Sequence, residues 1–222
     1  MKNPNFKLLG FLMSILAAIM LSSCSSDDAE STTSTIRLAV NTTAADSRMA
    51  SNLQFDSGSI TIRELVFDGE NGDVSVSRTK EQIATIDYAT GNVTPEVVVT
   101  IPSGNYSDVN LGIELQDVND TPTVVINGTY TNAKSEVIPV RFEFNSGEVF
   151  EANAVSVNIP EGANLIGKIT FDANSWFSTV TNGQMDNATQ TNGIIVISQT
   201  QNPAIFDVVA NRLDVETNAV FE

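Results

Sequence analysis

Apolar and polar residues alternate along most of the chain from residue 35 to residue 171, and turn residues interrupt the alternation at short intervals. Alternation with a period of two places every second side chain on the same face of an extended strand. It therefore predicts antiparallel strands, each with one buried face. The runs 36–40, 97–101, 109–115 and 155–159 are the clearest. Together the runs predict about nine or ten strands, which suffices for two stacked sheets.

Local signals add detail to this pattern. The apolar positions change phase after residue 62, which predicts a β-bulge near Arg63 or Glu64. Asn71-Gly72 predicts a hairpin turn. A polar loop is expected over Asn41–Gly58, and the strands at 124–130 and 140–144 are expected to pair.

The pattern changes after residue 172. Residues 173–180 predict a short helical turn, and the apolar run 193–198 predicts a strand. Asn202-Pro203 has the form of a helix start, and residues 219–221 predict a last short strand. We therefore predict a mainly β protein, an antiparallel β-sandwich with a small α-helical C-terminal extension from about residue 173. Residues 35–222 are expected to form one domain.

The first 23 residues have the pattern of a secretory signal peptide. Lys2 and Lys7 precede the apolar run Leu8–Leu21, and the small residues Ser22 and Ser23 end it. The run is shorter than the approximately 20 residues that a membrane-spanning helix needs. It therefore indicates a leader, residues 1–23, rather than a membrane span.

Cys24, the one cysteine of the chain, directly follows this leader. Leu21, Ser22, Ser23 and Cys24 together resemble the lipobox of bacterial lipoproteins. The resemblance implies cleavage before Cys24 and attachment of acyl chains to its thiol and amino group. It predicts a lipid-anchored protein and leaves Cys24 no role as a nucleophile or metal ligand. The alternative is an ordinary signal peptide followed by an unmodified thiol.

The residues after Cys24 are polar and acidic. Residues 24–34 contain nothing to pack and predict a flexible tether. Ser26, Asp27 and Asp28 resemble the export signal of Bacteroidota-type surface lipoproteins, which implies display on the outer face of the outer membrane. A plain solvated tether is the alternative interpretation.

The composition narrows the possible functions. The chain carries a net charge of −16, and loss of Lys2 and Lys7 with the leader makes the remainder still more acidic. Nucleic-acid binding depends on Lys and Arg, so we expect no nucleic-acid partner. The chain contains no histidine, which removes Ser-His and Cys-His catalysis and the commonest zinc ligand. Paired carboxylates could still support glycoside hydrolysis, but we predict a protein without catalytic residues or a confident metal site.

Two features allow more than one interpretation. Asp68, Glu70, Asn71 and Asp73 place oxygen ligands on a tight turn, where they could hold calcium or could simply form a solvated hairpin. The stretch Asp117–Asp120 offers the same choice. Calcium is the one cofactor that we consider.

Trp176 and Phe177 could form a stacking platform for a sugar, but such a pair more often fills the end of a core. We favour core packing for both rings. Calcium and sugar binding are thus possibilities that the sequence raises without deciding them.

The run Ile101–Leu111, which reads IPSGNYSDVNL, resembles a segment of uncharacterised bacterial lipoproteins with a transthyretin-like (prealbumin-like) sandwich. We extend this likeness over about residues 35–171. It implies the fold and assigns no activity.

Fimbrillin-like pilins, which are lipoproteins built from similar sandwiches, provide a weaker likeness. In those pilins, cleavage after an arginine removes the first strand, and a strand of the next subunit fills the groove. Arg48 lies at a suitable place for such a cut, although a surface arginine is the simpler interpretation.

These observations favour a monomeric, lipid-anchored β-sandwich at the cell surface that is not an enzyme and acts as a binding or structural module. Its expected partners are the outer membrane, through the acyl anchor, and a glycan or protein at the cell surface. The alternative is a pilus subunit or pilus-accessory protein that assembles by strand addition. Carboxylate-based glycoside hydrolysis is a more distant third.

Overall fold

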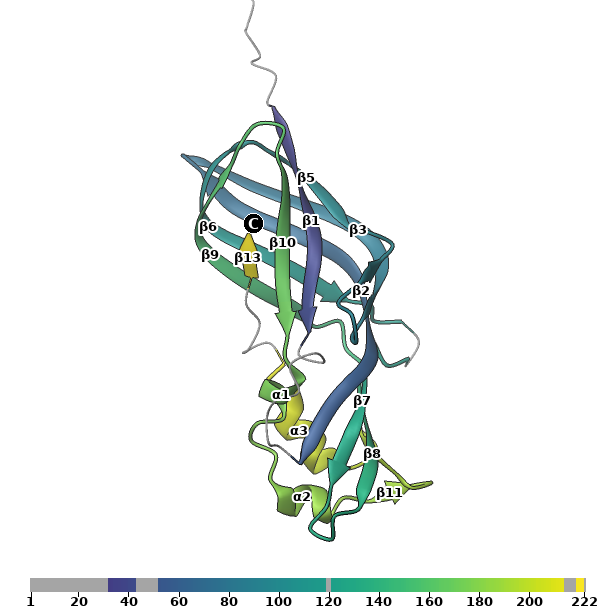
Figure 1. The fold of residues 1–222 in the computed structure, drawn as a ribbon. Helices are drawn as coiled ribbons and strands as arrows, with labels where there is room; N and C mark the ends of the chain where they lie inside the picture. Colours follow the sequence, from purple (N-terminus) through teal and green to yellow (C-terminus); the bar gives the residue numbers. More distant parts are fainter. Residues whose placement is uncertain (1–31, 43–51, 119–120, 214–218, 222) are drawn as a thin grey trace, which may run out of the picture. The chain divides into compact units, whose positions relative to one another are not determined.

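Two hydrogen-bonded sheets account for most of the structure, a computed structural model that describes residues 32–42, 52–118, 121–213 and 219–221. Strands make up 60% of the described residues and helices 10%. The predicted mainly β class, with a sandwich-like core and a small helical extension, is therefore confirmed. Figure 1 shows β1 and β10 of the first sheet crossing the long strands β2, β6 and β9 of the second.

The first sheet has four strands in the order β13-β10-β1-β5. β1 runs antiparallel to β5 but parallel to β10, so the sandwich is not purely antiparallel. Alternation reports which face of a strand is buried and says nothing about the direction of its neighbour. The strands are β1 (Thr33–Thr42), β5 (Val98–Pro102), β10 (Asn164–Phe171) and β13 (Ala219–Phe221).

β1 begins at Thr33, inside the segment predicted as a tether. The side chain of Ser34 is buried, and its hydroxyl donates to the carbonyl of Pro160 at 2.6 Å. Ile36, Leu38 and Val40 form the buried face of the strand, as the alternation predicts. The two residues before the predicted start therefore belong to the sheet.

The second sheet has the order β11-β12-β8-β7-β2-β3-β4, and β6 pairs with both β2 and β9. β12 runs parallel to β8, whereas the other pairs are antiparallel. The strands are β2 (Leu53–Asn71), β3 (Val74–Asp87), β4 (Val93–Thr94), β6 (Gly104–Leu115), β7 (Val124–Thr131), β8 (Val137–Phe144), β9 (Val149–Ile159), β11 (Gln190–Thr191) and β12 (Ile194–Ile197).

β2 links the two parts of this second sheet. Its first half, up to Ile60, pairs with β7, and its second half, from Ile62, pairs with β6. The register shifts between Ile62 and Glu64 in the ladders with β3 and with β6. The bulge predicted near Arg63 or Glu64 is thus confirmed, as are the hairpin at Asn71-Gly72 and the pairing of β7 with β8.

The polar loop predicted over Asn41–Gly58 is wrong at both ends. β1 continues to Thr42, and β2 begins at Leu53. A further register shift between Phe55 and Ser57 breaks the alternation in this part of β2. Because polar residues surround the shift, the alternation did not predict this part of the strand, although the Phe55 side chain is buried and only 3% exposed.

Three short helices follow β10: α1 (Ala173–Trp176), α2 (Asn182–Asp186) and α3 (Pro203–Ala210). They lie beside the part of the second sheet that contains β7 and β8 (Figure 1). Phe206 of α3 stacks on Phe142 and Phe144 of β8, with ring centroids 6.1 and 6.0 Å away. The helices thus extend the core over the inner face of these strands.

α3 has Pro203 in its first turn, as predicted, but Asn202 does not cap the helix with its side chain. Instead, the Asn202 amide group donates to the carbonyls of Thr189 and Val196 at 3.0 and 2.7 Å, and its oxygen accepts from the Thr189 N–H. Asn202 therefore joins the start of α3 to the β11–β12 hairpin.

Candidate functional site

A pocket of about 310 Å³ lies where the start of β2 meets β7, α1 and α2. Its volume is near the lower end of the range for ligand pockets, about 300–1,000 Å³. None of the ten residues that line it is charged at neutral pH. They are Asn52, Leu53, Phe55, Tyr130, Asn174, Phe177, Ser178, Val180, Asn182 and Met185.

The pocket has an apolar floor and a polar rim. Phe55, Tyr130, Phe177 and Met185 are each 5% exposed or less. Phe55 and Phe177 pack together with ring centroids 4.7 Å apart, and Phe177 also meets Phe142 edge to face. The floor is therefore continuous with the hydrophobic core, which fixes its shape.

Local capping signals position the two helices that border the pocket. The carboxylate of Asp172 accepts from the N–H of Ser175 at 3.1 Å and caps α1. Thr181 and Gln184 form a capping box at the start of α2. These caps hold the rim residues of α1 and α2 against the edge of the core.

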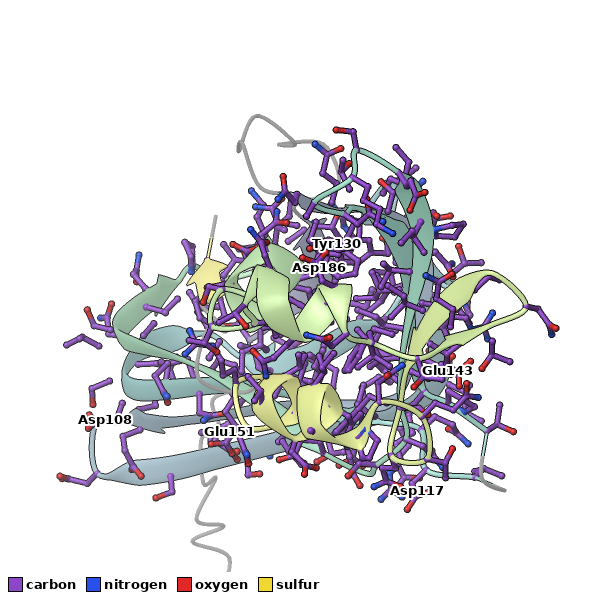
Figure 2. The ribbon with its side chains drawn as sticks, turned by 90° about the horizontal axis from the view of Figure 1, so that it is seen from below. Asp108, Asp117, Tyr130, Glu143, Glu151 and Asp186 are labelled. Atoms are coloured by element: carbon purple, nitrogen blue, oxygen red, sulfur yellow. The ribbon has the colours of Figure 1, made fainter. Side chains whose placement is uncertain are left out.

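Tyr130 ties α2 to β7 at one side of the pocket. Its hydroxyl donates to the Asp186 carboxylate at 2.9 Å, and the Asn182 carbonyl lies 3.2 Å away as an alternative acceptor for the same proton. Figure 2 shows Tyr130 and Asp186 close together. Burial, and then the hydrogen bond to Asp186, raises the pKa of Tyr130 to about 12. The phenol therefore stays protonated at neutral pH and serves as a hydrogen-bond donor.

The structure separates the roles of the Trp176-Phe177 pair. Trp176 is fully buried and meets Phe171 edge to face at 6.0 Å, so it is a core residue. Phe177 is 5% exposed and belongs both to the core and to the floor of the pocket. The two rings do not form a stacking platform together, which agrees with the core packing that we favoured.

The four residues considered for calcium are not brought together. Asp68 and Glu70 lie on one face of β2, whereas Asn71 follows Glu70 and so points to the other face. There its amide donates to the Ser103 carbonyl at 3.4 Å. Among the described residues, no group of three or more Asp, Glu, Cys or His side chains is placed to hold a metal ion. Calcium binding stays a prediction, but these four residues do not form one site together.

The second acidic stretch falls partly outside the described residues, because residues 119 and 120 are not described. Asp117 is described, and Figure 2 shows it well apart from Asp108, Glu143 and Glu151. Glu143 is paired with Arg141. These labelled acids therefore do not converge on one point.

Three glutamates do lie in a row on the outer face of the second sheet. Glu64 of β2 pairs with Glu81 of β3 on one side and with Glu114 of β6 on the other. Burial, and then the Glu114 carboxyl, raises the pKa of Glu64, while Arg63 opposes the shift. Arg63 also forms an ion pair with Glu114 at 3.2 Å. The row lies on an open strand face and contributes no residue to the pocket.

Several predicted site residues lie outside the described residues. These are Leu21, Ser22, Ser23 and Cys24 of the lipobox, Ser26, Asp27 and Asp28 of the export signal, and Arg48. The described residues contain no helix that is both long and apolar enough to span a membrane.

The pocket residues other than Phe177 were missed by sequence reasoning. Asn52 directly precedes β2, and Asn174 and Asn182 stand in the first turns of α1 and α2, where asparagine is common for local reasons of turn and helix-start geometry. The Thr181–Gln184 spacing was an available signal for α2. Nothing in the sequence indicated that these stretches meet at one pocket.

The fold and the pocket together define a mainly β, sandwich-like protein with a small, uncharged pocket beside its helical extension. Comparison of the chain with protein-family models, with curated proteins and with solved structures found no match. The resemblance to surface lipoproteins and pilins therefore stays a prediction from the sequence.

Proposed function

We propose that the chain is a lipid-anchored β-sandwich protein of the cell surface that works without catalysis, as a binding or structural module. The observation that carries the binding role is the uncharged pocket between β2, β7, α1 and α2. Such a pocket, apolar at its floor and polar at its rim, is the usual form of a ligand site.

The anchoring part of the proposal comes from the sequence. The leader, the lipobox and Cys24 stand in the order that lipoprotein processing requires. The first strand begins at Thr33, soon after Cys24, so a short tether joins the proposed anchor to the sandwich. Several acyl chains would hold the protein firmly, because each buried methylene contributes about 0.8 kcal/mol.

Mass spectrometry of the N-terminal peptide tests the anchor. We expect native protein to start at Cys24 with acyl chains attached, and Cys24→Ala to abolish both cleavage and acylation. Protease treatment of whole cells should degrade the wild-type protein, which would place it on the outer surface. A free, unmodified Cys24 thiol in native protein would overturn the anchor, and full protease resistance would overturn surface display.

The position of β1 favours a second candidate, a pilus subunit that assembles by strand addition. β1 lies inside the first sheet and pairs with β10 on one side and β5 on the other. It joins β2 through residues 43–52, which contain Arg48. Cleavage there would cut the covalent link between β1 and the rest, and loss of β1 would leave a groove lined by two open strand edges.

Gel electrophoresis without heating distinguishes this candidate from the monomeric module. A pilus subunit would give a ladder of heat-sensitive oligomers and a processed chain that starts at Met49, and Arg48→Gln would abolish both. Lys134→Gln, in an exposed turn, is the matched control and should leave them unchanged. A single acylated band of full mature length would rule out assembly by this route.

A further inference from the structure

The rim of the pocket carries polar side chains whose hydrogen-bonding groups are unused. Asn52, Asn174, Ser178 and Asn182 all line the pocket. Among the described residues, none donates a hydrogen bond to these four side chains or accepts one from them. Asn52 and Asn182 use their backbone carbonyls, which accept from the N–H of Thr131 and from the Tyr130 hydroxyl.

Three of these four side chains are primary amides. Each amide offers two N–H donors and one carbonyl acceptor, and the hydroxyl of Ser178 can also do both. A hydroxyl group of a ligand likewise donates and accepts. The rim is therefore matched to a ligand that presents several hydroxyl or amide groups at short intervals.

The electrostatics of the pocket favour a neutral ligand. No Lys or Arg lines the pocket, so a carboxylate or phosphate group would find no cationic partner there. The carboxylate of Asp186 lies just behind Tyr130, and the whole chain carries a net charge of −16. Both features repel an anion.

The floor adds an apolar surface. Phe177, Val180 and Met185 contribute carbon atoms from the helical segment, and Leu53 and Phe55 contribute them from β2. The C–H face of a sugar ring, or the methyl group of an N-acetyl substituent, can pack on such a surface while the hydroxyl groups reach the rim. The volume of about 310 Å³ suits a terminal sugar unit rather than a long chain.

We propose that this pocket binds a neutral saccharide, with the amides of Asn174 and Asn182 and the hydroxyl of Ser178 hydrogen-bonded to sugar hydroxyl or N-acetyl groups. This inference rests on the proposed binding function and names its ligand class. The sugar docks by its apolar face on Phe177 and Met185, and Tyr130 holds the α2 side of the pocket in place.

Saturation-transfer NMR and calorimetry test the proposal, with methyl glycosides of neutral hexoses and of N-acetylhexosamines as probes. We expect at least one probe to bind, and Asn174→Ala and Asn182→Ala each to weaken it about three- to tenfold, as loss of one hydrogen bond does. Ser178→Trp should abolish binding, because Ser178 is exposed and a large ring there fills the mouth without disturbing the core.

Asn105→Ala is the matched control, since Asn105 is an exposed asparagine of β6 outside the pocket. It should leave the affinity unchanged. Circular dichroism of every variant shows whether the fold is kept. Failure of folded wild-type protein to bind any neutral probe would overturn the proposal. Equal binding by the wild type and Ser178→Trp would do the same, because the sugar would then sit elsewhere.

The result of this binding test can be distinguished from the results of the tests of the anchor and of surface display. An acylated, surface-exposed protein that binds no saccharide would refute the ligand class and leave the anchored module in place. Saccharide binding by a protein with an unmodified Cys24 would refute the anchor and leave the pocket assignment in place. Tighter binding of sialic acid or a sugar phosphate than of the neutral probes would refute the electrostatic argument and with it the proposal.

Discussion

The link between Tyr130 and Asp186 allows a quantitative test of how α2 is held against β7. Tyr130 is 1% exposed, and its hydroxyl donates to the Asp186 carboxylate at 2.9 Å. Hydrogen bonds to charged groups contribute about 1.5–3 kcal/mol. Because Asp186 is itself exposed, water replaces part of the lost bond. We expect Tyr130→Phe to lower the free energy of unfolding by about 1.5–2 kcal/mol near pH 8.

The same link makes this difference depend on pH. In the unfolded chain a tyrosine loses its proton near pH 10, whereas burial and Asp186 raise the pKa of Tyr130 to about 12 in the fold. Between these values the unfolded state releases a proton that the folded state keeps, so stability falls as the pH rises through this window. By about pH 11.5 the loss reaches about 2 kcal/mol, and the advantage of the wild type over Tyr130→Phe should vanish.

Urea unfolding followed by circular dichroism at the two pH values measures the effect. Asp186→Asn is the second variant, because it keeps an acceptor but removes the charge. We expect Asp186→Asn to reduce the free energy of unfolding at pH 8. We also expect it to reduce the amount of stability that is lost at high pH. A gap between wild type and Tyr130→Phe that stays the same at both pH values would refute the assignment of the raised pKa to this residue.

Three further predictions concern stability, and urea unfolding checks each. Glu64→Gln should stabilise the protein by about 0.5 kcal/mol at pH 7, because it removes a like charge beside Glu114. The raised pKa of Glu64 means that stability falls as the pH rises past its ordinary value, so the gain should disappear near pH 4. Gly128→Ala should destabilise by about 3 kcal/mol or more, because a Cβ there would overlap the backbone carbonyl of Gln54 in the paired strand. Phe206→Ala should cost about 3–5 kcal/mol by emptying the contact between α3 and β8.

Two of these variants have a matched control, which is the same type of substitution at another position of the chain. Glu161→Gln changes the same charge in an exposed turn and should have no measurable effect on stability. Gly183→Ala adds the same methyl group where the nearest atom is 4.0 Å away, and it should be close to neutral or stabilising. A Gly128→Ala protein as stable as Gly183→Ala would contradict the close approach of β2 and β7.

Much of the fold could be predicted because burial on one face leaves a period of two in the sequence. The buried residues of β1 and β6, the hairpin at Asn71-Gly72 and the short strand β13 all followed from local signals. The direction of β1 relative to β10 could not follow, since the two strands lie far apart in the chain and alternation carries no direction. The beginning of β2 was missed because the register shift at Phe55–Ser57 breaks the period.

The pocket was beyond prediction for a different physical reason. Its lining comes from the start of β2, from β7 and from two helices near the C-terminal end of the chain. Tertiary contacts bring these parts together, namely the packing of Phe55 against Phe177 and the hydrogen bond from Tyr130 to Asp186. Asn174 and Asn182 are ordinary residues of the first turns of α1 and α2, so their shared place at the pocket is a property of the fold and not of any local motif.

The continuity of β2 has a consequence for how the protein responds to a ligand. Leu53 and Phe55 line the pocket, and the same strand runs on to Phe67, deep in the other half of the sheet. The two halves therefore share one continuous strand, so complete unfolding of β2 disrupts both. Binding of a ligand in the pocket should slow amide hydrogen exchange at Phe55, which lines the pocket. It should also slow exchange at Phe67, which the ligand does not touch.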